Sequence, residues 1–255
     1  MPGFIHIVGA RPNFIKAAPV VAALDAAGAE QQLIHTGQHY DRKMSEIFFE
    51  ELGLPEPDLN LGVGSGSHGT QTAALLVAME ETFSSAAPHR VVVYGDVNST
   101  LAAALTCAKL GIPIAHVEAG LRSFDASMPE EINRRVTDIL SDPLYVTAPE
   151  GEVNLAREGI SGDRVVFVGN PMIDTLLANL ERFDPTPVRT ELGLAGDYGV
   201  ATLHRPANVD TAEAAAALVG ALRAATARLP LVLPLHPRGQ ARLEAAGLGD
   251  VPDLT

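Results

Sequence analysis

Three acidic side chains stand where proton-transfer chemistry could be assembled. Asp96 directly follows one apolar run, Glu118 ends the next, and Glu130 opens a helical pattern. Because the carboxyl ends of parallel strands meet at one edge of a sheet, these carboxylates could converge there. Crowded carboxylates raise one another's pKa, which is how proteins make groups that donate and accept protons. Taken singly, each residue could equally be an ordinary turn or capping residue.

Two cations follow the first predicted strand. Arg11 lies in the turn after residues 4–8, and Lys16 lies in the first turn of the next helix. Positive charge is disfavoured at a helix N-terminus, because the helix dipole favours anions there. A bound anion would resolve this conflict. Both residues are therefore candidate anion ligands, and the alternative is that they are solvated surface cations.

Further candidates come from one helix and two later strands. Glu130, Asn133 and Arg134 fall on one helical face, since residues three and four apart are neighbours. His204 and His236 each end an apolar run and have an arginine shortly after them. A histidine that ends a buried strand is more often structural than catalytic, so both interpretations stay open.

Two other kinds of site find little support. Residues 64–69 match the G-x-G-x-x-G pattern, but no strong strand precedes them, and Glu80 and Glu81 fall inside a helical run. We expect a flexible glycine loop leading into a helix, not a nicotinamide site. Neither H-x-x-E-H nor C-x-x-C spacing occurs, so we expect no metal.

The positions of these residues follow from alternating strands and helices. Short apolar runs alternate with longer Ala-rich runs of helical period, which predicts a parallel sheet covered by helices on both faces. The expected strands are residues 4–8, 32–36, 90–94, 113–117, 144–147 and 165–168. The expected helices are residues 13–26, 42–52, 69–84, 99–110, 130–140 and 150–158.

The chain divides near a proline-rich segment at residues 184–187. We expect a Rossmann-like domain over residues 1–170, a connecting helix and linker over 171–186, and an incomplete second Rossmann-like domain over 187–255. This last part shows only two clear strands, which alone bury too little surface for independent stability.

Bulk composition limits the partners and the compartment. The 255 residues are 47% hydrophobic and 19% charged, which predicts a packed globular protein. The formal net charge of −13 argues against binding to nucleic acid or anionic membrane. The single cysteine, Cys107, fits a reducing compartment. The longest apolar tract, residues 101–115, is too short to span a bilayer, so we expect a cytoplasmic protein.

Eight segments in order resemble the non-hydrolysing UDP-N-acetylglucosamine 2-epimerase family. They are GARPNFIKAAPVV (9–21), TGQHYD (36–41), YGDVNST (94–100), HVEAGLRS (116–123), MPEEINR (128–134), VGNPMIDTL (168–176), TLHRPANVD (202–210) and LPLHPR (233–238). The resemblance implies an α/β fold of the GT-B type, with one complete Rossmann-like domain and the beginning of a second. It also implies a homodimer that needs neither a metal nor another cofactor.

The reaction implied by this resemblance is reversible epimerisation at C2 of UDP-N-acetylglucosamine, by elimination and re-addition of UDP, for polysaccharide biosynthesis. Matched motif by motif, Asp96, Glu118 and Glu130 are the acid and base carboxylates, and His204 assists near the diphosphate. Arg11, Lys16, Arg134 and His236 are the matched contacts to the nucleotide and its phosphates.

The sequence departs from the family pattern in three places. Ala10 replaces the usual Thr, and Ala207 stands where members often carry Glu. Members also continue into a Ser-Gly-Gly-x-x-Glu segment that does not occur in these 255 residues, so we expect a C-terminally truncated chain. Two alternatives remain: a hydrolysing 2-epimerase that releases free N-acetylmannosamine, and a non-catalytic fragment for sugar-nucleotide binding or dimerisation.

Overall fold

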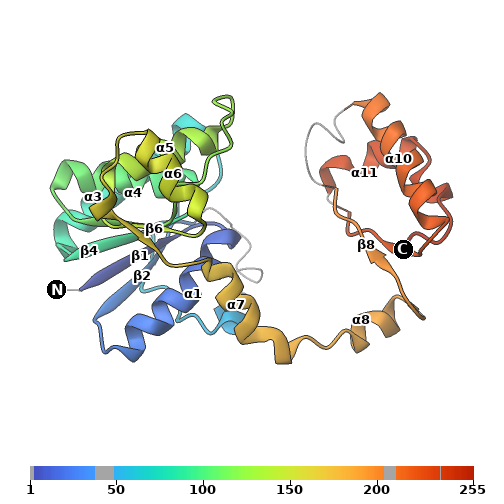
Figure 1. The fold of residues 1–255 in the computed structure, drawn as a ribbon, viewed down its shortest axis with the longest axis horizontal. Helices are drawn as coiled ribbons and strands as arrows, with labels where there is room; N and C mark the ends of the chain where they lie inside the picture. The colour runs from blue at the N-terminus through green and yellow to red at the C-terminus, as the bar shows by residue number, and fades with distance from the viewer. Residues whose placement is uncertain (1–2, 38–48, 204–210, 236) are drawn as a thin grey trace. The chain divides into compact units, whose positions relative to one another are not determined.

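The computed structural model describes residues 3–37, 49–203, 211–235 and 237–255 (Figure 1). Two compact units make up the chain, Met1–Leu180 and Glu181–Thr255. The predicted helix at 42–52 lies mostly outside the described residues; its last residues, 49–52, are helical.

A seven-stranded parallel sheet forms the centre of the first unit. Its strands lie in the order β3-β2-β1-β4-β5-β6-β7. Their bounds are β1 (Phe4–Val8), β2 (Gln31–His35), β3 (Leu59–Asn60), β4 (Arg90–Tyr94), β5 (Ile114–Ala119), β6 (Leu144–Val146) and β7 (Val165–Phe167). The chain adds strands in one direction from β1 to β3 and in the other from β4 to β7. The carboxyl ends of β1 and β4 therefore flank a topological switch point, where ligands bind in open α/β sheets.

Helices cover both faces of this sheet (Figure 1). One face carries α1 (Arg11–Ala26), against which α7 (Pro171–Asn179) packs. The opposite face carries α3 (His68–Ala86), α4 (Asn98–Leu110), α5 (Pro129–Leu140) and α6 (Pro149–Arg157). This arrangement confirms the predicted parallel sheet, and most elements begin within two residues of the expected position.

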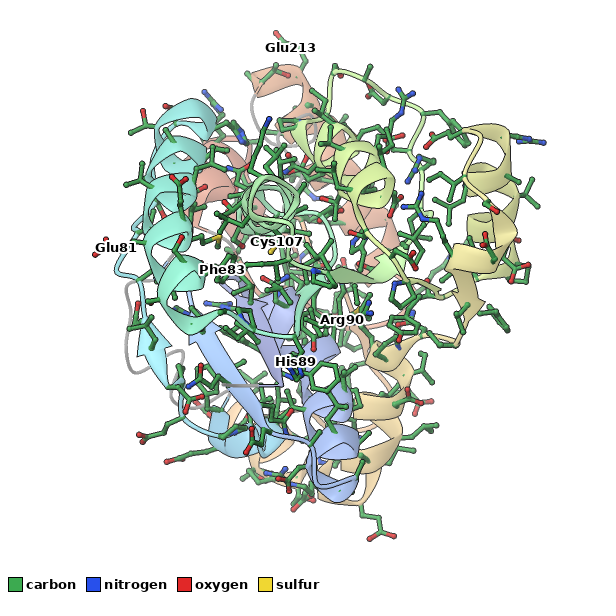
Figure 2. All side chains as sticks on the ribbon, turned by 90° about the vertical axis from the view of Figure 1, so that its left-hand side faces the viewer. Glu81, Phe83, His89, Arg90, Cys107 and Glu213 are labelled. Atoms are coloured by element: carbon green, nitrogen blue, oxygen red, sulfur yellow. The ribbon has the colours of Figure 1, made fainter. Side chains whose placement is uncertain are left out.

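Small and medium apolar side chains fill the layer between α3, α4 and the sheet. Phe83, Met79 and Cys107 lie in this layer with Ile5 and Val93 from the strands. Figure 2 labels Phe83 and Cys107 in this part of the fold. Burial raises the pKa of the Cys107 thiol to about 12, so the thiol is an inert, protonated part of the core.

One segment of the first unit differs from the sequence prediction, and a neighbouring one agrees with it. Residues 59–63 make a poor strand pattern, and no strand was predicted there. Leu59 and Asn60 nevertheless pair with Ile34 and His35 of β2 and form the edge strand β3. Such a short, exposed edge strand has no apolar alternation by which to recognise it. The glycine run at 64–69 leads into α3, where Ser67 accepts a hydrogen bond from the backbone N–H of Thr70, as expected for a helix cap.

The second unit has its own small α/β core. Strand β8 (Gly199–Val200) pairs in parallel with β9 (Leu231–Val232), and residues 253–255 run along the other side of β9. Among the described residues of this unit, the helices are α8 (Thr186–Glu191), α10 (Ala212–Thr226) and α11 (Pro237–Ala245). Short 3-10 turns occupy Gly162–Arg164 and Leu180–Arg182 of the chain and Leu248–Asp250 of this unit. The sequence analysis did not predict that residues 253–255 would pair with β9, because three residues are too few to show a periodic pattern.

Among the described residues, no helix is long and apolar enough to cross a bilayer.

Candidate active site

A buried ion pair marks the switch point of the large sheet. Lys16, in the second turn of α1, pairs with Glu118 near the end of β5. The Lys16 side chain is 8% exposed and that of Glu118 is 14% exposed. A lysine ammonium this far inside a protein needs a paired anion, since an isolated buried charge is strongly disfavoured. The pair joins α1 to β5 across the end of β4.

Gly95, directly after β4, makes room for this pair. A Cβ atom at this position would lie 2.8 Å from Lys16 Nζ and 3.1 Å from Glu118 Oε2. The backbone φ of Gly95 is also +64°, a region that side chains other than glycine rarely adopt. Both constraints require glycine between the ion pair and Asp96.

Glu118 has an unusual backbone conformation. Its φ is 76°, in the left-handed region, and the pairing of β5 with β6 shifts register between Val117 and Ala119. A bulge of this kind re-aims a side chain at the end of a strand. Positive φ in a residue with a long side chain is strained and persists only where the surroundings hold it. The fold thus fixes the direction of this carboxylate.

Asp96 belongs to a second network of charged side chains. Arg134 of α5 contacts Asp96 Oδ2 at 2.6 Å and Glu131 Oε2 at 2.8 Å. The neighbouring side chain of Asn133 donates to the backbone oxygen of Asp96 at 2.8 Å. One turn of α5 therefore fixes both the backbone and the carboxylate of Asp96.

Glu131 connects this network to the loop between β5 and α5. Its carboxylate accepts hydrogen bonds from the backbone N–H groups of Ser123 and Phe124, and from the Ser123 hydroxyl at 3.0 Å. Burial alone would raise the pKa of Glu131, but the donors from Ser123 and Arg134 outweigh it and hold the pKa below its ordinary value. For Arg134, burial would lower the pKa, and Asp96 and Glu131 raise it. Both groups are charged at neutral pH.

The remaining predicted residues fall in different places. Arg11 is the exposed first residue of α1. Glu130 is half-buried in the first turn of α5, next to the residue that binds Arg134. His204 and His236 lie outside the described residues. The structure thus brings Lys16, Glu118, Asp96, Arg134 and Glu130 to one edge of the large sheet.

Residues that the sequence analysis did not select complete this edge. Asn13 accepts from the N–H groups of Gly9 and Ala10 at 3.1 and 3.0 Å and donates to the backbone oxygen of Tyr94 at 2.8 Å. It thereby ties the turn after β1 to the end of β4. Glu131 was passed over as one of two acids in a helix N-terminal turn, where acids are common for capping reasons alone.

The chemistry available here is proton transfer beside a concentration of positive charge. Two carboxylates stand here, Glu118 paired with Lys16 and Asp96 paired with Arg134. Positioned carboxylates of this kind can serve as acid or base in proton transfer. The cations can offset negative charge that develops on a bound group. Among the described residues, no cluster of three or more His, Cys, Asp or Glu side chains is suited to hold a metal ion.

Comparison with known proteins identifies relatives along almost the whole chain. A family profile described as UDP-N-acetylglucosamine 2-epimerase matches residues 22–252. The UDP-2,3-diacetamido-2,3-dideoxy-D-glucuronate 2-epimerase of Pseudomonas aeruginosa is 45% identical over 250 residues, which are 96% of this chain and 69% of that protein. The UDP-N-acetylglucosamine 2-epimerase of Methanocaldococcus jannaschii is 42% identical over 96% of this chain and 68% of its own length.

Solved structures give the same result. The M. jannaschii UDP-GlcNAc 2-epimerase in complex with UDP-GlcNAc and UDP superposes with a TM-score of 0.86 at 39% identity, covering 99% of this chain and 72% of that one. The Neisseria meningitidis enzyme bound to UDP-GlcNAc gives 0.86 at 27% identity, covering 98% and 71%. The fold is accordingly GT-B-like, a complete Rossmann-like parallel-sheet domain followed by a smaller α/β unit.

Proposed function

The chain belongs to the UDP-N-acetylglucosamine 2-epimerase family, and on that premise we propose that it interconverts UDP-N-acetylglucosamine and UDP-N-acetylmannosamine by inverting C2. The observation that carries this proposal is the paired arrangement of Lys16 with Glu118 and Arg134 with Asp96 at the switch point. The M. jannaschii structure that superposes on this chain holds UDP-GlcNAc and UDP.

The proposed reaction has two halves. In the first, a carboxylate takes the C2 proton, the C1–oxygen bond breaks, and UDP leaves with its electron pair, giving 2-acetamidoglucal. In the second, a proton reaches the opposite face of C2 while an oxygen of UDP re-forms the bond to C1. Asp96, Glu118 and Glu130 are the proposed proton donors and acceptors, and His204 assists beside the diphosphate.

The proposed role of the cations follows from the leaving group. Departure of UDP places additional negative charge on the diphosphate, and fixed positive charges stabilise that transition state. Lys16 and Arg134 are already held in position by carboxylates, so they need little reorganisation when the charge develops. Arg11 and His236 are further proposed contacts to the nucleotide.

The relative from P. aeruginosa supports a second candidate substrate. That protein is named a UDP-2,3-diacetamido-2,3-dideoxy-D-glucuronate 2-epimerase, and its identity to this chain is 45%, against 42% for the M. jannaschii enzyme. The same C2 chemistry would apply to this sugar. Rates with the two sugar nucleotides at equal concentration decide which substrate is preferred.

Product analysis tests the proposed function. The protein is incubated with UDP-N-acetylglucosamine, and the products are separated by anion-exchange chromatography. The expected result is a constant mixture of the two UDP-sugars, reached from either side. Free N-acetylmannosamine with stoichiometric UDP would identify a hydrolysing 2-epimerase. Binding of UDP-N-acetylglucosamine without any product would identify a binding module.

We further propose that the protein is a cytoplasmic homodimer. The lone, buried Cys107 fits a reducing compartment, and the family resemblance implies a dimer. Light scattering coupled to size-exclusion chromatography measures the oligomeric state, and a mass near 26.8 kDa across a range of concentrations would contradict it.

A further inference from the structure

Asp138 is a fully buried carboxylate beneath the candidate site. It lies in the last two turns of α5 and has no exposed side-chain surface. Its oxygens contact three positions of one stretch of chain: His116 Nδ1 at 2.7 Å, the N–H of Gly120 at 3.1 Å, and Arg122 Nη1 at 2.8 Å. One side chain therefore holds the chain on both sides of Glu118.

His116 extends this contact to the next strand. Its Nε2 lies 2.8 Å from the backbone oxygen of Gly95, and a carbonyl oxygen only accepts, so Nε2 carries a hydrogen. The N–H of Gly95 donates to the Val117 oxygen at 3.0 Å. Gly95 is thus fixed to β5 through both its N–H and its C=O, immediately before Asp96.

Asp138 has close polar partners for both of its oxygens. Its carboxylate faces Nδ1 of His116, and the Gly95 carbonyl faces Nε2, so an oxygen lies against each ring nitrogen. Burial alone would raise the pKa of Asp138, but His116 and Arg122 outweigh it and keep the pKa below its ordinary value. Arg122 in turn pairs with Glu158, the residue that follows α6; its Nη2 lies 2.7 Å from Glu158 Oε2.

We propose that Asp138 is a positioning residue, which acts through His116 and Gly120 to hold the strained backbone of Glu118 and the Gly95–Asp96 peptide in the geometry that proton transfer requires. Glu118 has a φ of 76° between two residues that Asp138 holds. Without those contacts the bulge can relax, and the Glu118 carboxylate moves away from its position beside Lys16. This inference rests on the proposed function, because its consequence is catalytic.

A purely structural role predicts something different. If Asp138 only joined α5 to the sheet, its loss would lower stability and leave each folded molecule as active as before. A positioning role predicts a lower kcat with little change in KM, because substrate contacts remain while the reacting groups are misaligned. The two roles separate when activity is expressed per folded molecule.

The test uses Asp138→Asn, which keeps the shape of the side chain. The kcat is expected to fall about 10- to 100-fold, with KM changed less than about threefold. His116→Gln, which removes the contact to Gly95 and leaves Arg122 and Gly120 in place, serves as the second variant if Asp138→Asn does not fold. It is expected to show the same split between kcat and KM.

The matched control is His6→Asn. His6 is another fully buried histidine, on β1, whose two nitrogens contact Tyr94 and Gln31 instead of the site. Its kcat per folded molecule is expected to equal that of the wild type. Wild-type kcat in both Asp138→Asn and His116→Gln would overturn the inference.

A crystal structure of Asp138→Asn gives an independent readout. Glu118 is expected to leave the left-handed region and to separate from Lys16; an unchanged Glu118 backbone would overturn the inference even without an assay. If the wild-type protein shows no turnover, the proposed function fails. This structure still decides whether Asp138 holds the Glu118 backbone.

Discussion

Helices α4 and α5 are neighbours on the same face of the sheet, yet they bury opposite kinds of residue. Helix α4 buries small apolar side chains, among them Ala102, Ala103 and Cys107. Helix α5 buries Glu131, Asn133, Thr137 and Asp138. Its isoleucines point outward, with Ile132 53% exposed and Ile139 60% exposed.

This contrast separates the helix that stabilises the fold from the helix that sets the geometry of the site. A helix of a globular protein normally turns its apolar stripe to the core. Buried polar groups are unfavourable unless they are hydrogen-bonded, and Glu131, Asn133 and Asp138 are each bonded to the site or to the strand beneath it. We infer that α4 mainly stabilises the fold, whereas α5 mainly aims Asp96 and Glu118.

The largest effect on turnover is expected from substitution of the two carboxylates that α5 positions. Glu118→Gln and Asp96→Asn are each expected to lower turnover at least ~100-fold, the usual scale for a positioned acid or base. Folding should survive, because both side chains lie at the edge of the sheet. Steady-state kinetics and circular dichroism check these two results together. Near-normal turnover in both variants would remove the carboxylate mechanism.

Acid should destabilise the fold through His6, the buried histidine of β1. Burial lowers the pKa of His6 to about 4, from an ordinary 6.5. Below pH 6.5 the unfolded chain therefore binds a proton that the folded chain does not. Stability is expected to fall between pH 6.5 and 4, by about 3 kcal/mol from this residue.

Urea unfolding at pH 7 and pH 4 measures this loss. His6→Asn removes the titrating group, so its stability should depend less on pH over the same window. Asp138, whose pKa is lowered, adds a loss of the same sign only at more acidic pH. A His6→Asn variant with the full wild-type pH dependence would contradict the assignment to His6.

A larger side chain in the packed layer between α4 and the sheet should reduce the stability of the fold and leave turnover unchanged. Ala103 has no exposed surface, so Ala103→Val adds two methyl groups to a filled layer and is expected to destabilise the fold by about 1–3 kcal/mol. Its turnover per folded molecule should match the wild type. A specific loss of turnover in this variant would show that α4 also contributes to the site.

The smallest effect is expected where the two helices are alike. Thr106 of α4 and Thr137 of α5 both have a buried hydroxyl with no hydrogen-bond partner in the described part of the chain. Thr106→Val and Thr137→Val remove that hydroxyl at nearly constant shape, and each should stabilise the fold by about 1 kcal/mol. Thermal unfolding of the two variants tests this. A loss of stability in either would indicate a partner for that hydroxyl.

Much of the first unit could be predicted from the sequence. Strands β1 and β4 have the predicted bounds, because short apolar runs between turn residues define them locally. Lys16 and Glu118 were both selected, since the carboxyl edge of a parallel sheet is where such residues meet. Their roles as ligand and proton-transfer group stay predictions.

The contribution of α5 could not be predicted in the same way. The rule that apolar residues face inward would place Ile132 and Ile139 in the core, and the structure turns Asp138 inward instead. Only the partners of Asp138, which come from β5 and the loop after it, explain this choice. The positive φ of Glu118 is likewise a tertiary effect, because nothing in its local sequence favours it.

Exchange of the C2 proton tests the central claim most directly. The protein is incubated with UDP-N-acetylglucosamine in deuterated water, and the C2 proton is followed by NMR beside a Glu118→Gln control. We predict that deuterium replaces hydrogen at C2 in both UDP-sugars, and that the control exchanges at least ~100-fold more slowly. Formation of UDP-N-acetylmannosamine with the original hydrogen retained at C2 would contradict proton transfer by the carboxylates of this site.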